Sequence, residues 1–435
     1  MKFVSTRGNA PAADLGSAFL AGLASDGGLY VPEHLPSLRV LDFDGCSSLP
    51  EVATRLLRPF FAGSKLELEL ASICNEAFDF PTPLTVLANT SNVYVLELFH
   101  GPTAAFKDVG ARFLAACLAR LHRGERDLTI LVATSGDTGA AVASAFHRRP
   151  GLRVVILYPD GRVSPRQAHQ LGCFGDNVRA FKVNGSFDDC QRLVKQALAD
   201  RELQAQQPLS SANSISLGRL LPQMSYYAMA ALMHWRARGC ELGFVIPTGN
   251  LGNAMAAIMA RAIGLPISTI TLATNANRVL PVFFDGADYA PQSSVATLAN
   301  AMDVGAPSNF ERLQWLYPDP RALRAAFIAR AVDDDAIRAS IVRAEHDHDV
   351  MLCPHSACAL DVLEQLRRSG DPSDLAIVAT AHAAKFEQVV EPLLGHAVAV
   401  PASLNALLER PSSATPLAAT YGAFLAALQS SPSPD

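Results

Sequence analysis

The chain has 435 residues, about three times the length of a typical domain, so two or three domains are expected. Its 36 lysines and arginines against 41 aspartates and glutamates leave a formal net charge of −5, which offers no basic surface for nucleic acid. Hydrophobic residues make up 49% of the chain and charged residues 18%, which excludes an intrinsically disordered protein.

Membrane and secretory signals are not apparent. No apolar run approaches the length of about 18 residues that crosses a bilayer, and the longest, 226–235, is typical of a buried helix. The first 16 residues contain no apolar segment after their positive charges. The eight cysteines form no CxxC pair, which favours reduced thiols. We expect a cytoplasmic monomer or homodimer with no membrane or nucleic-acid partner.

The first 80 residues show helical periodicity. It covers 14–23, 50–61 and 67–78, and Pro81 and Pro83 then interrupt the chain. This pattern predicts a small, mainly helical N-terminal domain over residues 1–80.

From Val93 onward, short apolar runs alternate with longer helical patterns, which predicts a largely parallel α/β region over residues 81–425. The expected strands are 93–98, 128–133, 153–158, 179–183, 242–246, 269–273 and 375–379. The expected helices are 108–121, 139–147, 187–198, 218–237 and 253–263. Ligands of such folds bind beyond the C-terminal ends of the strands. The Ser- and Pro-rich end, 426–435, is predicted to be disordered.

Two glycine-rich turns follow predicted strands: 247–253 (PTGNLGN) and 134–139 (TSGDTG). Each precedes a helix start, where free N–H groups and the helix dipole favour an anion. Neither a P-loop nor a dinucleotide GxGxxG motif is present. Ordinary strand–helix turns, with Asp137 or Ser135 as a helix cap, are the alternative. Two such turns favour a ligand with two anionic groups, or a cofactor with an anionic substrate.

Only six of the 36 basic residues are lysines, and Lys107 is the one in an apolar setting where a loop meets a helix. Partial desolvation there lowers the pKa of an amine and makes it available for a Schiff base. A desolvated lysine, a phosphate-binding turn and an α/β fold together indicate pyridoxal phosphate (PLP).

A metal site is the competing interpretation of the segment 345–358, which is rich in His, Cys, Asp and Glu. His346 and His348 are two residues apart and point to different faces of a helix. Cys353 and Cys358 lack the spacing of a zinc knuckle. We therefore predict no metal. His100 and His355 are each interpreted as either a structural histidine or a group near the substrate.

Six segments resemble the threonine synthase family. They are MKFVSTRG with AGLASDGGLYVPEHLP, HGPTAAFKDVGARF, ATSGDTGAAVASAF, SANSISLGRLLPQMSYY, PTGNLGNAMAA and ATAHAAKFEQVV, in order from residue 1 to about residue 395. The resemblance is to the bacterial and fungal type with a helical N-terminal domain. It implies the PLP-dependent fold type II, similar to tryptophan synthase β, with two α/β lobes and the small N-terminal domain.

The resemblance also implies roles for particular residues. Lys107 would carry PLP as a Schiff base, and Thr380 would hydrogen-bond the pyridine nitrogen. Asp137 would lie near the hydroxyl of the ring. The implied phosphate-binding loop is Gly249, Asn250, Leu251, Gly252 and Asn253. The implied substrate-binding residues are Ser135, Thr138, Asn213, Ser214 and Arg219.

Two positions depart from the family pattern, because Asn253 replaces a frequent aspartate and Ala383 a frequent proline. Both affect the expected tuning of substrate binding more than the reaction class. Arg219 is the expected ligand of the substrate phosphate, with a surface position as its alternative. Lys385, like Ser135 and Thr138, is the next candidate.

The implied activity is that of a carbon–oxygen lyase acting on a phosphate ester. O-phospho-L-homoserine and water would give L-threonine and phosphate, by γ-elimination and β-addition of water, as the last step of threonine biosynthesis. Lys107 would remove the α-proton. A related PLP-dependent dehydratase or phospho-lyase giving 2-oxobutyrate is one alternative, and a non-catalytic PLP-fold protein is the other.

Overall fold

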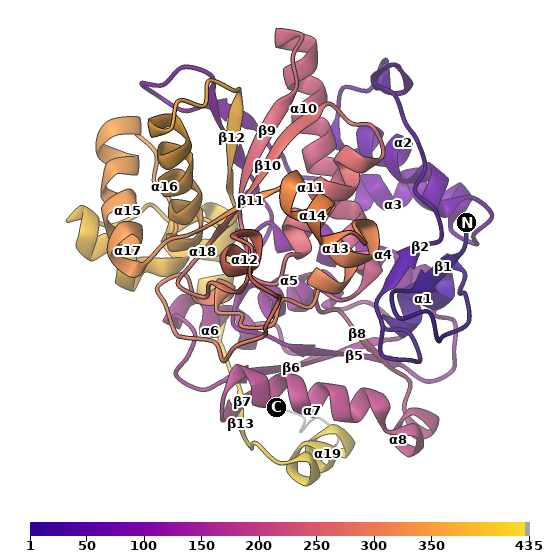
Figure 1. Cartoon of the computed structure of the whole chain (residues 1–435). Coiled ribbons are helices and arrows are strands. Elements are labelled where there is room, and N and C mark those ends of the chain that lie inside the picture. The colour runs from indigo at the N-terminus through magenta and orange to yellow at the C-terminus, as the bar shows by residue number, and fades with distance from the viewer. Residues whose placement is uncertain (431–435) are drawn as a thin grey trace.

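Two separate sheets form the frame of the computed structural model, which describes residues 1–430 (Figure 1). The first sheet has six strands in the order β11 (Ile328–Ala331), β10 (Ile267–Thr274), β9 (Leu242–Pro247), β12 (Leu375–Ala379), β4 (Val93–Glu97) and β3 (Leu84–Val86). The second has five strands in the order β13 (Thr415–Ala418), β7 (Val178–Asn184), β6 (Leu152–Pro159), β5 (Leu128–Ala133) and β8 (Leu209–Ser211). All neighbours are parallel except β3 and β4.

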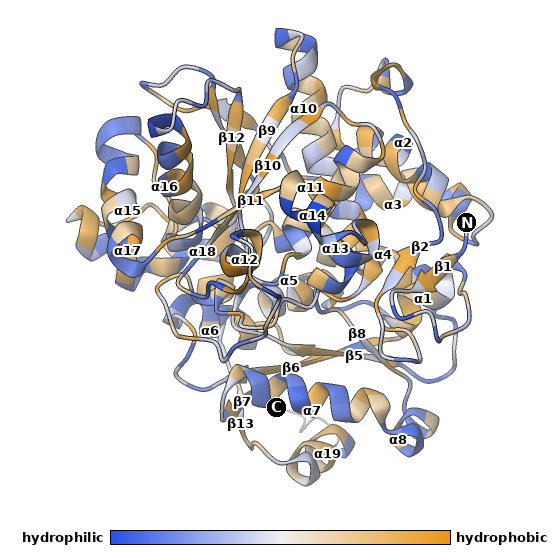
Figure 2. Cartoon of the chain, viewed as in Figure 1, coloured by the Kyte–Doolittle hydropathy of each residue, from blue (hydrophilic) through white to orange (hydrophobic). Residues whose placement is uncertain are grey.

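The apolar runs of the central strands are explained by burial on both faces. In β9, Phe244 and Ile246 belong to the central core cluster, whereas Val245 between them packs into a second cluster. In β5, Ile130 belongs to the central cluster and Leu131 to a third. Side chains alternate across a strand, so each sheet has a core on both sides. Figure 2 shows these strands as mainly hydrophobic, while the outer helices α7 and α15 carry many hydrophilic residues.

Helices cover both sheets. They are α4 (Lys107–Leu121), α5 (Asp137–Phe146), α6 (Pro165–Gly172), α7 (Phe187–Ala199), α8 (Arg201–Gln206), α9 (Leu217–Leu220), α10 (Met224–Arg238), α11 (Gly252–Ala262), α12 (Val279–Phe284), α13 (Phe310–Leu316), α14 (Pro320–Ala326), α15 (Asp334–His348), α16 (Pro354–Arg368), α17 (Glu387–Leu394), α18 (Ala402–Leu408) and α19 (Tyr421–Gln429). Short 3-10 helices are η3 (Leu221–Gln223), η4 (Asn300–Met302) and η5 (Ala383–Phe386). Helices α4 and α5 pack into the central cluster between the sheets.

The N-terminal residues contain α1 (Leu15–Ala21), η1 (Val40–Phe43), α2 (Leu49–Phe61), η2 (Glu67–Glu69) and α3 (Leu70–Ala77). They also contain an antiparallel pair that the sequence did not predict, β1 (Phe3–Ser5) with β2 (Tyr30–Pro32). Arg312 connects these residues to the α/β region. Its guanidinium is fully buried and donates to the carbonyls of Tyr30, at 3.0 and 3.1 Å, and Ile215, at 2.7 Å.

Two predicted elements need correction. The helix expected over 218–237 is broken into α9, η3 and α10, because Pro222 has no N–H to continue the helix. Residues 426–429, placed in the predicted disordered tail, belong to α19, whose Phe424 and Leu428 are buried against the five-stranded sheet region. The rest of that tail, 431–435, lies outside the described residues.

The cysteines and helices bear on two further expectations. All eight cysteines lie in the described part of the chain and are free thiols. In residues 1–430, every helix is too short or too polar to cross a membrane.

Candidate active site

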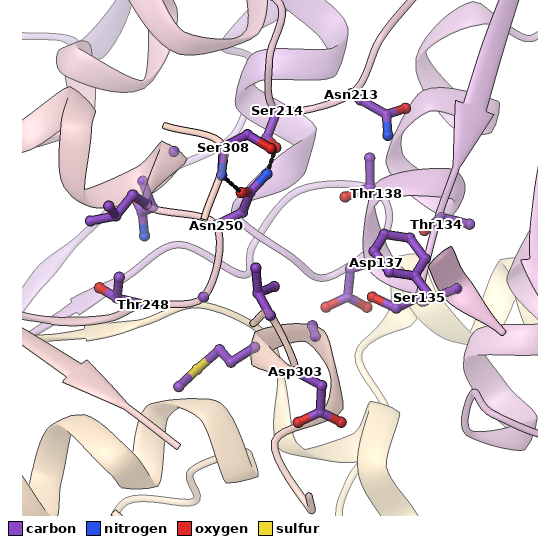
Figure 3. A pocket seen from close by; sticks show the side chains of 18 of the residues that line it. Thr134, Ser135, Asp137, Thr138, Asn213, Ser214, Thr248, Asn250, Asp303 and Ser308 are labelled. Atoms are coloured by element: carbon purple, nitrogen blue, oxygen red, sulfur yellow. Dashed lines mark hydrogen bonds between the residues drawn. The ribbon is translucent and has the colours of Figure 1, made fainter. Parts of the chain in front are cut away.

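A cavity of about 360 Å³ opens where strands of both sheets end. The residues that follow β5, β9 and β12 line it, together with the start of α4 (Figure 3). This is the edge at which parallel sheets bind ligands. All thirteen predicted site residues line this one cavity, although they are up to 273 positions apart, from Lys107 to Thr380.

Lys107 is the first residue of α4, and its side chain is half-buried in the cavity wall. The loop before it is tied to the end of β12, since the Phe106 N–H donates to the Thr380 carbonyl at 2.8 Å. Burial and, to a smaller extent, the positive charges of Arg219 and Lys385 lower the pKa of Lys107 to about 8, although Asp137 opposes them. A substantial fraction of this amine is therefore neutral near physiological pH.

The turn after β9 forms a cradle of backbone donors. Within residues 1–430, no N–H of Gly249 to Asn253 donates a hydrogen bond to another protein group. Helix α11 begins at Gly252, which adds the positive end of its dipole. The Asn250 side chain shapes the turn, donating to Ser214 Oγ at 2.6 Å and accepting from the Ser308 N–H (Figure 3). Consecutive unpaired N–H groups at a helix start fit a phosphate.

The two glycines of this turn meet different surroundings. A Cβ at Gly249 would lie 2.7 Å from Met302 Cα, so the backbone of η4 excludes any side chain there. A Cβ at Gly252 would be 3.5 Å from Ser214 Cβ, an ordinary contact. A Cβ therefore fits among the protein atoms at Gly252 but not at Gly249.

The turn after β5 is held by Thr134, whose hydroxyl accepts from the N–H groups of Gly136 and Gly139, both at 3.0 Å. The hydroxyls of Ser135 and Thr138 line the cavity and make no hydrogen bond to another group in the described chain. These two hydroxyls are available to an anionic ligand.

Asp137 begins α5 and presents its carboxylate to the cavity (Figure 3). Its Oδ1 accepts from Lys385 Nζ at 2.7 Å and from Gln167 Nε2 at 3.0 Å. Burial by itself would raise the pKa of Asp137. The positive charges of Lys385 and Lys107 outweigh that effect and hold the pKa well below its ordinary value, so the group is a carboxylate at neutral pH.

Arg219 is buried, with 3% of its surface exposed, so the alternative of a surface arginine is wrong. Its Nη1 donates to the Ala212 carbonyl, while its Nε is buried without a partner in the described residues. Burial lowers the pKa of Arg219 to about 10, which leaves it positively charged. A charged, incompletely bonded guanidinium in a cavity wall suits an anion.

Asn213 and Ser214 lie on the loop before Arg219. Asn213 Nδ2 donates to the Ala133 carbonyl at 3.0 Å, which joins this loop to the end of β5. The Ser214 hydroxyl is engaged by Asn250. Asn253, which replaces the frequent aspartate, accepts from the hydroxyls of Tyr226 at 2.5 Å and Tyr227 at 2.9 Å, and its Nδ2 has no partner in residues 1–430.

Thr380 follows β12 directly. Its N–H donates to Ser356 Oγ at 3.1 Å and its carbonyl accepts from Phe106, so the residue is held on both sides. The side-chain hydroxyl lines the cavity and has no hydrogen-bond partner in the described chain. It is free to bond a ring nitrogen.

The sequence did not decide whether His100 and His355 lie near the substrate, and the structure places them differently. His355 lines the cavity, and its Nε2 accepts from the Ala301 N–H at 3.0 Å. Burial lowers the pKa of His355 to about 4, so the ring is neutral. His100 lies outside the lining and pairs with Glu97 at 2.7 Å.

Asp303 is a cavity residue that no sequence pattern signalled. Burial raises its pKa to about 6. Its carboxylate accepts from Asn275 Nδ2 at 2.8 Å and from the Thr297 hydroxyl at 2.7 Å. These contacts anchor the loop that closes one side of the cavity.

The metal-ligand types in 345–358 do not gather in the structure. In the described chain, the one group of at least three such side chains is His234, Cys240 and Asp374. Arg238 Nε lies 3.4 Å from the same Asp374 oxygen that His234 contacts at 3.0 Å. Arg238 therefore already supplies a positive charge beside Asp374. The absence of a metal stays a prediction.

Comparison with known proteins identifies the family. Residues 77–382 match the family model of pyridoxal-phosphate-dependent enzymes, residues 2–78 the threonine synthase N terminus, and residues 356–426 the threonine synthase C-terminal model. A threonine synthase from Haemophilus influenzae is 39% identical over 88% of this chain and 89% of its own length.

The chain belongs to the threonine synthase family.

Solved threonine synthase structures share the fold along nearly the whole chain. The structure from Escherichia coli aligns with a TM-score of 0.90 at 35% identity, covering 98% of this chain and 99% of its own. The PLP-bound structure from Brucella melitensis aligns with a TM-score of 0.87 at 37% identity, covering 97% of both chains. The protein is therefore a PLP-dependent enzyme of fold type II, as the resemblance implied.

Proposed function

We propose that this enzyme converts O-phospho-L-homoserine and water to L-threonine and phosphate in the cytoplasm. One observation carries the proposal: a single cavity holds a partly neutral lysine, a cradle of unpaired N–H groups and, separately, the Arg219 guanidinium, whose Nε has no partner in the described residues. The cavity thus offers one anion site for a cofactor phosphate and another for an anionic substrate. Eight free cysteines support the cytoplasmic location.

The chain's residues fit PLP. Lys107 is the amine that binds it covalently, and residues 249–253 hold its phosphate through backbone N–H groups. The free hydroxyl of Thr380 would bond the pyridine nitrogen, and Asp137 would be placed near the ring hydroxyl. When bound, PLP supplies an electron sink that stabilises a carbanion at the substrate α-carbon.

Substrate binding is assigned to the other polar residues that line the cavity. Arg219 binds the γ-phosphate by charge-assisted hydrogen bonds, and its burial limits competition from water. The hydroxyls of Ser135 and Thr138 and the polar groups of Asn213 and Ser214 complete the sites for phosphate and carboxylate. Lys107 takes the α-proton, because its lowered pKa leaves enough neutral amine to act as a base.

Identification of the product tests this proposal. Purified PLP-loaded enzyme is incubated with O-phospho-L-homoserine, and amino-acid analysis and a phosphate assay should show L-threonine and phosphate in equal amounts. The alternative, a phospho-lyase or dehydratase, would give 2-oxobutyrate and ammonia. Phosphate release without threonine would contradict the proposal.

Gly252→Ala should weaken PLP binding about tenfold to a hundredfold. The new methyl group has room among the protein atoms, so it acts by obstructing a phosphate bonded to the cradle. The loss of one hydrogen bond to a charged group costs about 1.5–3 kcal/mol. The measurement is the PLP dissociation constant by equilibrium dialysis.

Gly422→Ala is the matched control, since a Cβ there meets nothing within 4 Å and α19 lies outside the cavity lining. Equal PLP affinity in the two variants would place the phosphate elsewhere. Gly249→Ala is less informative, because clash with the Met302 backbone would disturb the loop with or without a ligand.

Thr380→Ala should weaken PLP binding and slow turnover by up to about tenfold each. It removes one neutral hydrogen bond, worth about 0.5–1.5 kcal/mol, and leaves the backbone contacts of the residue intact. Thr380→Ser keeps the hydroxyl and should behave almost as wild type. A crystal structure with PLP that shows a carboxylate against the pyridine nitrogen would overturn this assignment.

A further inference from the structure

Lys385 is a fully buried lysine whose contacts bridge the two lobes. It lies in η5, just after β12 of the six-stranded sheet, and its side chain has no exposed surface. Its Nζ donates to Asp137 Oδ1, at the end of β5 in the other sheet, and to the Thr103 carbonyl, both at 2.7 Å. Lys385 does not line the cavity, so its place among the phosphate ligands was a wrong expectation.

The two oxygens of the Asp137 carboxylate differ in their contacts. Oδ1 receives Lys385 and Gln167, whereas Oδ2 makes no hydrogen bond in residues 1–430. Figure 3 shows this carboxylate beside the Ser135 hydroxyl and below Thr138. Two donors on one oxygen fix the rotation of the carboxylate and leave the other oxygen for the cavity.

Thr103 connects Lys385 to the start of α4. Its N–H and hydroxyl donate to Asp108 at 2.9 and 2.7 Å, and Asp108 is itself fully buried beside Lys107 at the start of α4. The loop that carries Lys107 is therefore connected to Asp137 through Lys385. Burial raises the pKa of Asp108.

The titratable groups around Asp137 and Lys107 come from several elements packed there. They are Lys385 on η5, Lys107 and Asp108 on α4, Arg219 on α9, His355 on α16 and the thiol of Cys353 before α16. Lys385 and Asp137 act on Lys107 with opposite sign: the lysine lowers its pKa and the carboxylate raises it. The carboxylate has the larger of these two effects, and Lys385 offsets part of it.

We propose that Lys385 is a positioning residue, which holds Asp137 ionised with one oxygen in the cavity and offsets part of the negative charge that Asp137 presents to Lys107. This inference rests on the proposed function, because it assumes that Lys107 binds PLP. Removal of the Lys385 charge leaves the Asp137 carboxylate uncompensated beside Lys107, which favours the protonated nitrogen. Removal of the Asp137 charge leaves Lys385 to repel that proton.

The test is the visible absorbance of the PLP-loaded enzyme as a function of pH, which reports protonation of the nitrogen that joins PLP to Lys107. Lys385→Met should move the midpoint up by about one pH unit or more, and Asp137→Asn should move it down by a similar amount. The double variant, which removes the whole pair, should have a midpoint between those of the two single variants. Lys385→Arg, which keeps the charge, should also remain close to it.

Lys65→Met is the matched control, since Lys65 is exposed and distant in sequence from every cavity residue. Midpoints that move in the same direction in both single variants would overturn the proposal. The two variants remove opposite charges, so a shift in one direction would indicate a general disturbance of the site and not an effect of charge. If Lys385→Met does not fold, the double variant decides, since removal of both partners of a buried pair is tolerated better than removal of one. A double variant identical to Asp137→Asn would overturn the proposal. Failure of wild type to bind PLP would instead reject the proposed function.

Discussion

Replacement of Lys107 by alanine is expected to abolish threonine formation, with a rate at or below about a thousandth of wild type. The amine is proposed both to bind PLP covalently and to carry the α-proton, and its loss removes both functions. The fold should persist, because the side chain is half-buried at a helix start and no hydrogen bond within residues 1–430 depends on it. The measurement is threonine release under saturating PLP.

Two comparisons make this result specific. Lys107→Arg keeps the positive charge but cannot form the covalent link, so it should be as inactive as Lys107→Ala. PLP should still bind both variants without a covalent bond, through the backbone of 249–253, and should be removed by dialysis after borohydride treatment. Threonine formation at the wild-type rate in either variant would contradict the assignment of Lys107.

Arg219→Ala should raise the KM for O-phospho-L-homoserine about tenfold to a hundredfold, with little change in PLP affinity. A charged hydrogen bond of this kind contributes about 1.5–3 kcal/mol. Arg219 lines the cavity and is positively charged, and its Nε has no partner in the described residues. The KM is measured beside the PLP dissociation constant of each variant.

Competition by inorganic phosphate distinguishes substrate binding from a structural function of Arg219. If its guanidinium binds the substrate phosphate, the variant should also lose sensitivity to phosphate and to a phosphonate analogue of the substrate. Arg219→Lys should recover part of that sensitivity, since the charge remains but the bidentate geometry is lost. Undiminished inhibition of Arg219→Ala would move the phosphate site to Ser135 and Thr138.

Local patterns in the sequence predicted the strands and turns that form the candidate active site. The seven predicted strands all exist, because β5, β9 and their neighbours are apolar runs buried on both faces. The turns at 134–139 and 247–253 were found because glycine and hydroxyl residues after a strand have few structural uses other than a tight turn or an anion site. Elements with weak local signals were missed, such as β8 and β11, which are three and four residues long.

The sequence by itself therefore determined the α/β class and predicted the candidate lysine and the two candidate anion-binding turns, since each depends on residues close together in the chain. Only the tertiary structure decided that β12 inserts between β4 and β9, that Arg219 is buried, and that Lys385 pairs with Asp137. Periodicity reports which face of an element is buried but not which distant segment buries it. The pairing of charges across 248 residues depends on that long-range packing, because burial and partners, not residue type, set the protonation of a side chain.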